Sequence, residues 1–283
     1  MDFIELTTDQ RDFFSANGYL IVPGALDPQR LQDITEAADR LMHDFAYENY
    51  YQHRREGLVQ NPTLAELATR SATASLAIQL LGTHIHITNT ALIYKHPQPA
   101  DESGDCTWHR DVGVHLDIGH INLPRVGLKL GYCLTDMPGS NTGATLFAPG
   151  SNHQQQPLLI PSGQIHPTTY IEPVLNAGDA FLFESRIYHG AAINNQDHIA
   201  KIAMFGYHYS WIRPENYLKY YDGEVQPNAA MLKDLDDVGR QLLGATIDCQ
   251  GRKAHNGIDW PIDKWAEEHG LSLARAPQRI DAA

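Results

Sequence analysis

Apolar residues at helical spacing dominate the first third of the chain, residues 1–83. Thr7 and Gln10 form a capping box, and the helix that they begin ends at Gly18, a residue type that commonly follows the last turn of a helix. A short apolar stretch, residues 19–22, comes next. The pattern therefore predicts a helix followed directly by a short strand.

A second, longer helix is predicted from Asp27 and Pro28, which suit the N-cap and the first helical position. Its buried stripe consists of Leu31, Ile34, Ala38, Leu41 and Phe45. A third helical stretch covers residues 61–80 and ends at Gly82. Between these helices, residues 47–58 are rich in tyrosine and charge. Their apolar residues follow no helical or strand period, so neither a helix nor a strand is predicted there.

From residue 84 the pattern changes to β-branched and aromatic residues separated by Gly, Pro, Asn and Asp, which predicts short strands joined by turns. The strands are expected at 84–94, 106–111, 126–135, 144–148, 168–175, 180–188 and 199–209. Because helices do not alternate with these strands, the pattern favours a sandwich or jelly roll over a parallel α/β sheet.

Beyond the strands we expect a helix over residues 229–243 and a weakly specified tail, disordered from Ala274 onward. No linker or internal repeat divides the chain. The sequence therefore predicts one domain, 1–283, made of the helical part, a β core at 84–211 and a C-terminal helix and tail at 212–283.

Composition and charge exclude several classes of partner. The formal net charge of −13 would repel nucleic acid and anionic membranes. The start of the chain lacks the features of a signal peptide, and no apolar run approaches the roughly 20 residues that cross a bilayer. The three cysteines, Cys106, Cys133 and Cys249, are too scattered for a disulfide framework or a cysteine zinc site. We expect a soluble cytoplasmic protein with a small-molecule substrate, and a homodimer remains open.

The segment from Cys106 to Asp111 carries the first candidate chemistry. If it is a strand, His109 and Asp111 share one face and can reach the same metal ion. A third ligand would complete a two-histidine, one-carboxylate set, which leaves positions open for a cosubstrate and O2. His189 is the candidate, since a jelly roll brings distant strands together. The plainer alternative is a salt bridge and polar residues that stabilise strand ends.

Several segments, taken in order, resemble the phytanoyl-CoA dioxygenase family of Fe(II)- and 2-oxoglutarate-dependent oxygenases. They are Thr8-Asp-Gln10 to Asn17-Gly-Tyr-Leu-Ile-Val-Pro-Gly24, Trp108-His-Arg-Asp111, Leu134-Thr-Asp136, Gly143-Ala-Thr-Leu146, Pro149-Gly-Ser-Asn-His153, and Gly178-Asp179 to His189-Gly190 with Asn194. The resemblance covers nearly the whole chain. It implies a mainly β fold, a double-stranded β-helix or cupin-like jelly roll, with N-terminal helices packed on one sheet.

The same resemblance implies that His109, Asp111 and His189 bind Fe(II), with 2-oxoglutarate as cosubstrate and O2 as oxidant. Four further histidines match no ligand position, and we expect packing or surface roles for them: His115, His120, His153 and His208. Because halogenating relatives replace the carboxylate ligand with a small residue, Asp111 disfavours halogenation.

The cosubstrate anchor departs from the family pattern. The family usually places an arginine eleven or twelve residues after the distal histidine, where its guanidinium grips the far carboxylate with two parallel hydrogen bonds. This chain has Lys201 there, which offers a point charge with less geometric control. Lys201 is either that anchor or a solvated strand lysine. Asn89 stands where the family often supplies an amide to the cosubstrate, although it could equally serve the sheet.

Lys129 is the third candidate for binding the cosubstrate. Strand alternation places it on one face with Gly127, Gly131 and Cys133, and we expect this face to line the barrel interior. A buried ammonium group needs an anionic partner. That partner is 2-oxoglutarate, an acidic substrate or a structural carboxylate such as Glu184, and the sequence does not rank these three.

The implied reaction is oxidation of a small organic molecule coupled to decarboxylation of 2-oxoglutarate to succinate and CO2. Hydroxylation is the default outcome, with desaturation, cyclisation and epimerisation open. A natural-product intermediate is favoured over an acyl-CoA, which would need a more basic entrance. Expected substrate walls are residues 47–51, 112–125, the loop after His153 and residues 207–211. The alternatives are a non-catalytic metal-binding jelly roll and a cupin-type enzyme that does not use 2-oxoglutarate.

Overall fold

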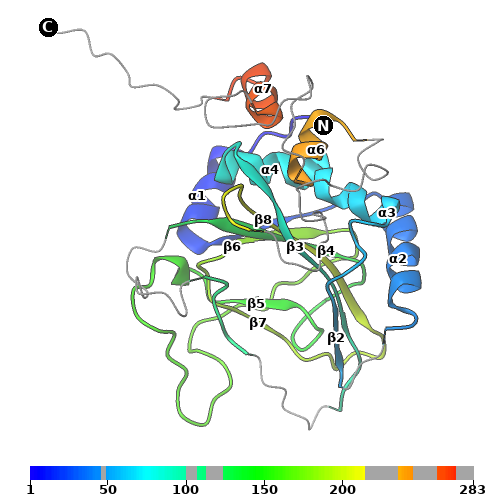
Figure 1. Cartoon of the computed structure of the whole chain (residues 1–283). Coiled ribbons are helices and arrows are strands. Elements are labelled where there is room, and N and C mark those ends of the chain that lie inside the picture. Colours follow the sequence, from blue (N-terminus) through cyan, green and yellow to red (C-terminus); the bar gives the residue numbers. More distant parts are fainter. Residues whose placement is uncertain (46–48, 100–106, 113–123, 214–234, 245–259, 272–283) are drawn as a thin grey trace, which may run out of the picture.

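The computed structural model describes residues 1–45, 49–99, 107–112, 124–213, 235–244 and 260–271. Its centre is an antiparallel six-stranded sheet in the order β1-β6-β4-β8-β3-β2, and β5 and β7 pair in a second, smaller sheet. The strands are β1 Tyr19–Val22, β2 Tyr51–Arg54, β3 Ile85–Lys95, β4 Gly127–Cys133, β5 Thr145–Phe147, β6 Ala180–Glu184, β7 His189–Ala191 and β8 Ala200–Tyr209. Figure 1 shows the two sheets as opposed layers, which is the predicted jelly-roll architecture.

The longer helices cover one face of the large sheet, the face turned away from β5 and β7 (Figure 1). The helical elements are α1 Thr8–Asn17, α2 Pro28–Met42, α3 Pro62–Ala65, η1 Glu66–Thr69, α4 Ser71–Leu81, η2 Ser151–His153, α6 Asp237–Leu242 and α7 Pro261–Glu268. The capping box at Thr7 and Gln10 is present, and Gly18 ends α1 in the left-handed conformation at φ 81°. None of the described helices is long and apolar enough to cross a membrane.

The structure differs from the sequence predictions at several places in the first half of the chain and the β core. The helix expected at 61–80 is divided into α3, η1 and α4, and the extended conformation of Arg70, with ψ 122°, separates η1 from α4. Residues 47–58, for which no element was predicted, contain β2. The strand expected at 168–175 is reduced to two isolated bridges, at Ile171 and Leu175.

The C-terminal part was predicted only in outline. The end of the expected helix is present as α6, and residues 229–234 of that prediction lie outside the described residues, as does the tail from Ala274. Helix α7 was missed. It begins at Pro261, with Trp260 as its N-cap, and buries Ile262, Trp265 and Ala266.

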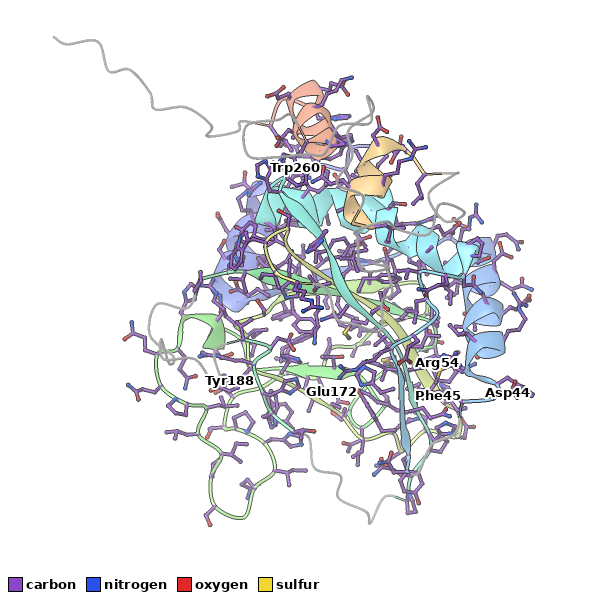
Figure 2. The ribbon with its side chains drawn as sticks, viewed as in Figure 1. Asp44, Phe45, Arg54, Glu172, Tyr188 and Trp260 are labelled. Atoms are coloured by element: carbon purple, nitrogen blue, oxygen red, sulfur yellow. The ribbon has the colours of Figure 1, made fainter. Side chains whose placement is uncertain are left out.

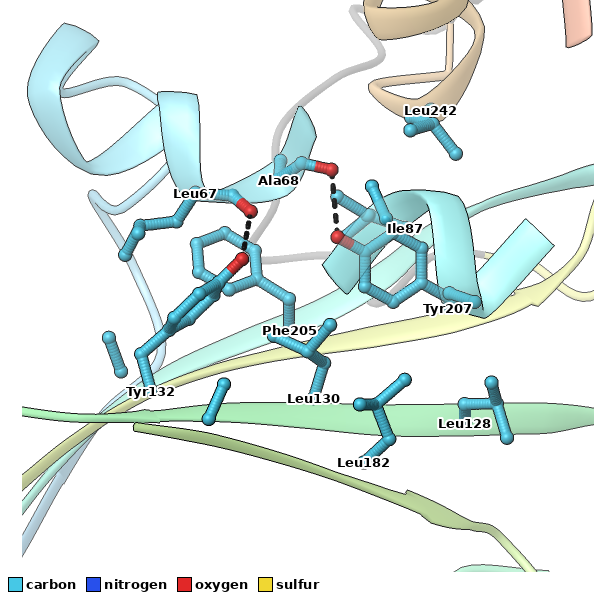
Figure 3. Packing of buried hydrophobic residues seen from close by; sticks show 14 of the residues in the cluster. Leu67, Ala68, Ile87, Leu128, Leu130, Tyr132, Leu182, Phe205, Tyr207 and Leu242 are labelled. Atoms are coloured by element: carbon cyan, nitrogen blue, oxygen red, sulfur yellow. Dashed lines mark hydrogen bonds between the residues drawn. The ribbon is translucent and has the colours of Figure 1, made fainter. Parts of the chain in front are cut away.

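Strand alternation gives the large sheet two different faces. The face under the helices carries large apolar and aromatic residues, among them Leu128, Leu130, Tyr132, Leu182, Phe205 and Tyr207. Figure 3 shows two tyrosines of this face reaching the short helix η1. The hydroxyl of Tyr132 donates to the carbonyl of Leu67 at 2.8 Å, and that of Tyr207 donates to the carbonyl of Ala68 at 2.7 Å. These bonds hold the helical layer in register with the sheet.

The opposite face of the large sheet looks toward β5 and β7. Its apolar part forms a second core cluster that includes Phe181, Phe183, Ile202 and Met204. At the edge strand β2, side chains alternate between the two faces. Figure 2 shows Arg54 beside Phe45 on the outer side, where the guanidinium lies 5.4 Å from the ring centroid. The neighbouring His53 therefore points to the inner side.

Candidate metal and cosubstrate site

Backbone pairing brings the two parts of the predicted triad together. His109 and His189 form an isolated antiparallel bridge, in which each amide donates to the carbonyl of the other at 3.0 Å. The amide of Asp111 donates to the carbonyl of Ser185 at 3.1 Å. The strand expected at 106–111 is therefore a single bridge at His109 within the described residues 107–111, but this bridge is enough to place both side chains beside His189.

The three side chains converge on one point. The Nε2 atoms of His109 and of His189 each lie 3.8 Å from Oδ1 of Asp111. One ligand atom from each residue can be chosen so that all lie within 4.8 Å of one another. The cluster offers two imidazole nitrogens and one carboxylate oxygen, a donor set associated with non-haem Fe(II).

Hydrogen bonds fix which imidazole nitrogen faces this point. Nδ1 of His109 lies 2.7 Å from the carbonyl oxygen of Thr107, and Nδ1 of His189 lies 3.2 Å from that of Ile187. A carbonyl oxygen can only accept, so both Nδ1 atoms carry the proton and both Nε2 lone pairs are available to a metal. Thr107 presents its carbonyl with φ 39°, a conformation uncommon for a β-branched residue.

The carboxylate is ionised and has one free oxygen. Burial raises the pKa of Asp111, but the positive charges of His189, Lys129 and His109 outweigh it and lower the pKa to about 2. Oδ1 accepts a hydrogen bond from Nζ of Lys129 at 2.7 Å, whereas the buried Oδ2 has no hydrogen-bond partner among the described residues. Because an unpaired buried oxygen is costly, the donor set fits a bound metal ion.

The triad opens into a cavity of about 910 Å³ between the two sheets. Strands β2, β3, β4 and β8 supply one wall, and β5 and β7 supply the other. Its polar lining includes Asn89, Lys95, Lys129, Arg55, His53 and His208. The cavity is large enough for 2-oxoglutarate together with a second small molecule.

Residues 14–202 match the sequence model of the phytanoyl-CoA dioxygenase family, which is more than half of the chain. The chain belongs to the phytanoyl-CoA dioxygenase family. Members of this family are Fe(II)- and 2-oxoglutarate-dependent oxygenases, so the protein is an enzyme of this kind, with iron, 2-oxoglutarate and O2 as its cofactors. This confirms the family that the sequence motifs indicated.

Individual relatives are distant. The ectoine dioxygenase of Nocardia farcinica is 24% identical over 225 residues, which are 67% of this chain and 74% of that protein. The epimerase SnoN, solved with Fe3+, alpha ketoglutarate and nogalamycin RO, has a TM-score of 0.60 and 21% identity over 77% of this chain and 93% of its own. EctD from S. alaskensis, solved with 2-oxoglutarate and 5-hydroxyectoine, has a TM-score of 0.59 and 21% identity over 74% of this chain and 78% of its own. These likenesses confirm the jelly-roll fold.

The side chain of Lys201 points away from the cavity. Its ammonium group pairs with both carboxylate oxygens of Asp39 on α2, at 2.7 and 2.9 Å, and lies 5.3 Å from the centroid of the Tyr94 ring. Position 201 belongs to the set of β8 side chains that face the helices, whereas Met204 faces the cavity. The prediction that Lys201 anchors 2-oxoglutarate is therefore wrong, because the period of two turns its side chain to the other face of the sheet.

Lys129 and Asn89 both line the cavity, on opposite sides of a glycine. Each is the register partner of Gly206 on β8, and a Cβ at Gly206 would lie 2.1 Å from Oδ1 of Asn89. Of the three partners considered for Lys129, the structure provides a structural carboxylate, but it is Asp111 rather than Glu184. The carboxylate of Glu184 accepts from Arg125 and Arg186 instead.

Sequence reasoning missed Lys95, which belongs to the cavity face of β3. Lys95 is 5% exposed and is the register partner of Ala200. Its ammonium group donates to the carbonyls of Gly143 and Ala144, at 2.5 and 3.2 Å. Ala200 lies eleven residues after His189, so Lys95 places a cation beside a position where the family usually has its arginine. Side chains alternate between the two faces of a strand, so Lys95 shares the cavity face of β3 with Asn89. This alternation could have identified Lys95 from the sequence.

His208 is a second residue whose place differs from expectation. Its Nδ1 lies 2.6 Å from the hydroxyl of Thr88, and its ring covers Gly127, where a Cβ would lie 2.1 Å from the imidazole. It lines the cavity rather than serving only in packing. His115 and His120 lie outside the described residues.

The expected substrate walls are present only in part. Tyr50 and Tyr51 line the cavity. Tyr207 faces the helices, and Trp211 is 73% exposed. None of residues 154–170, all of which the structure describes, lines the cavity. Residues 46–48 and 113–123 of the other predicted walls lie outside the described residues.

Proposed function

We propose that the protein oxidises a small organic molecule, with His109, Asp111 and His189 as the iron ligands. The observation that carries this proposal is the arrangement of the triad, in which both Nδ1 atoms are committed to backbone carbonyls and one buried carboxylate oxygen is left without a partner. Iron bound there, with 2-oxoglutarate and O2, supplies an oxidant for a carbon–hydrogen bond while 2-oxoglutarate is converted to succinate and CO2.

Lys95 is the residue that we propose for the far carboxylate of 2-oxoglutarate. The carbonyl of Ala144 accepts from Lys95 and also from the amide of Ala192, three residues after His189. Three residues of strand span roughly 10 Å. A five-carbon dicarboxylate is about 5 Å long. The side chains of His189 and Lys95 cover the rest of the roughly 10 Å between the two positions. A metal held by His189 and the ammonium group of Lys95 can therefore bind opposite ends of one cosubstrate molecule.

Substitution of the two lysines separates this proposal from the earlier one. With Co(II) in place of iron, Lys95→Met should weaken 2-oxoglutarate binding about tenfold or more, because a desolvated charge pair is lost. Lys201→Met, the matched control, should change the dissociation constant by less than about twofold, since its partner is Asp39. Equal losses in the two variants, measured by calorimetry, would refute the role of Lys95.

Small natural-product intermediates are the substrates that we favour. The names of the relatives support this choice, since they refer to ectoine and to nogalamycin RO. Retention of Asp111 favours hydroxylation, desaturation, cyclisation or epimerisation over halogenation. The test is O2-dependent succinate formation in the presence of candidate substrates. Stimulation by a substrate in the native protein but not in His109→Ala supports the proposal, and succinate formation that survives this substitution contradicts it.

A further inference from the structure

Lys129 is a cation that contacts the triad directly. Its ammonium group donates to Oδ1 of Asp111 at 2.7 Å, and Asp111 is its one hydrogen-bond partner among the residues that the structure describes. Oδ1 is also the oxygen that lies 3.8 Å from Nε2 of His109 and 3.8 Å from Nε2 of His189. The ammonium group and the two nitrogens available to a metal therefore lie around the same carboxylate oxygen.

The strands beside Lys129 provide no second anion for it. Its register partners are Gly206 on β8, which has no side chain, and Phe183 on β6, whose ring centroid lies 4.5 Å from that of His189. Register partners are the nearest neighbours on one face of a sheet. The side chain of Lys129 is 20% exposed and that of Asp111 is 14% exposed. Solvent ions screen a pair as buried as this one only in part, so the positive charge acts strongly on the site.

A positive charge at this place acts on the metal ion and on the cosubstrate with opposite sign. The ammonium group of Lys129 repels a divalent ion, and it takes up part of the negative charge that Asp111 offers to that ion. The same group attracts dianionic 2-oxoglutarate at the metal-loaded site. Because a divalent metal ion and 2-oxoglutarate together carry no net charge, the two effects largely cancel for the pair.

We propose that Lys129 balances the charge of the metal site: it weakens the binding of the metal ion alone and strengthens the binding of 2-oxoglutarate to the metal-loaded protein. This inference rests on the proposed function, since it takes the triad as the metal ligands. Lys129 is a positioning residue, because it acts through Asp111. At a given concentration of 2-oxoglutarate, fewer metal ions then occupy the site without the cosubstrate.

Two dissociation constants measured on the same variants test the proposal. Calorimetry gives the constant of Co(II) for the metal-free protein, and then that of 2-oxoglutarate for the protein saturated with Co(II). Lys129→Met should bind Co(II) about tenfold more tightly and 2-oxoglutarate about tenfold more weakly. Lys129→Gln should shift both constants in the same two directions, because its amide can still donate to Asp111 but carries no charge. Lys129→Arg, which keeps the charge, should stay within about threefold of the native protein in both.

Lys201→Met is the matched control, because it removes a lysine from the other face of the same sheet, where the partner is Asp39. It should change neither constant by more than about twofold. If Lys129→Met does not fold, the comparison of Lys129→Gln with Lys129→Arg gives the same test.

Opposite shifts of the two constants distinguish charge balance from a purely structural role of Lys129. If Lys129 only oriented Asp111, its removal would weaken the binding of Co(II). Shifts in the same direction, a shift of only one constant, or no shift when the charge is removed would overturn the proposal. If the native protein does not bind Co(II), or if His109→Ala binds it equally well, the proposed function itself fails.

Discussion

At the scale of single residues, Gly206 makes room for a polar side chain in the cavity. Without a side chain there, Asn89 lies across β8 and faces Lys129 from the other side. Gly127 has the same role under His208. Two glycines on the inner face of the sheet therefore leave room for two polar side chains that line the cavity.

Gly206→Ala should destabilise the fold by about 1–3 kcal/mol, because the new Cβ overlaps the amide of Asn89. Asn89→Ala should relieve much of that cost in the double variant, which a double-mutant cycle in urea unfolding would measure. Gly139→Ala is the control, since a Cβ there meets no atom within 4 Å. Additive effects of the Gly206 and Asn89 substitutions would show that the contact does not matter.

The cluster of two histidines and one carboxylate could be predicted from the sequence, but the direction in which Lys201 points could not. His109, Asp111 and His189 lie in segments whose residue spacing and family motifs are distinctive. For the anchor, a spacing of eleven or twelve residues covers both Ala200 and Lys201, which point to opposite faces of β8. Only the register of the strand decides between them. Lys95 lies on the neighbouring strand β3, so counting residues from His189 to β8 could not identify it.

At the scale of elements, the helical layer and the cavity use different faces of one sheet. The bonds from Tyr132 and Tyr207 to the carbonyls of η1 lie wholly on the helix side. Changes on this side should therefore alter the stability of the fold while leaving the metal site intact.

Tyr132→Phe and Tyr207→Phe should each lower the free energy of unfolding by about 1 kcal/mol, since each removes a buried hydrogen bond. Tyr170→Phe should have almost no effect, because that hydroxyl bonds to no described residue. Denaturant unfolding measures the cost, and Co(II) binding should stay unchanged in all three variants. A loss of metal affinity in Tyr132→Phe or Tyr207→Phe would contradict the separation of the two faces.

Elements with strong alternation were predicted closely, and elements that depend on tertiary contacts were not. Strands β3, β4 and β8 agree with their predicted bounds within a few residues, because their inner and outer residues differ clearly. Strand β2 is a short edge strand that exists through its pairing with β3. The break at Arg70 likewise depends on its surroundings, since its side chain reaches the carbonyl of Ala25 and the carboxylate of Asp27.

At the scale of the whole molecule, buried neutral histidines make stability depend on pH. Burial is the main cause that lowers the pKa of His53 and of His208 to about 4, from 6.5 in the unfolded chain. Between these values the unfolded chain binds more protons than the folded one, so stability decreases as the pH falls.

Between pH 7 and pH 5, the midpoint of urea unfolding should therefore fall, and His53→Gln should show a smaller fall than the native protein. Carboxylates with lowered pKa values, such as Asp111, do not contribute in this window, because they are ionised in both states. A midpoint that is constant or rises on acidification would show that these rings are not buried neutral in solution.

The central claim is that His109, Asp111 and His189 bind Fe(II) and that 2-oxoglutarate chelates this metal. Anaerobic titration of the iron-loaded protein with 2-oxoglutarate tests it most directly, through the weak visible charge-transfer band of the chelate. The band should appear in the native protein and in the control His43→Ala, an exposed residue on the surface, and should be absent from His109→Ala. Iron that stays bound while the native protein shows no band on addition of 2-oxoglutarate would contradict the account.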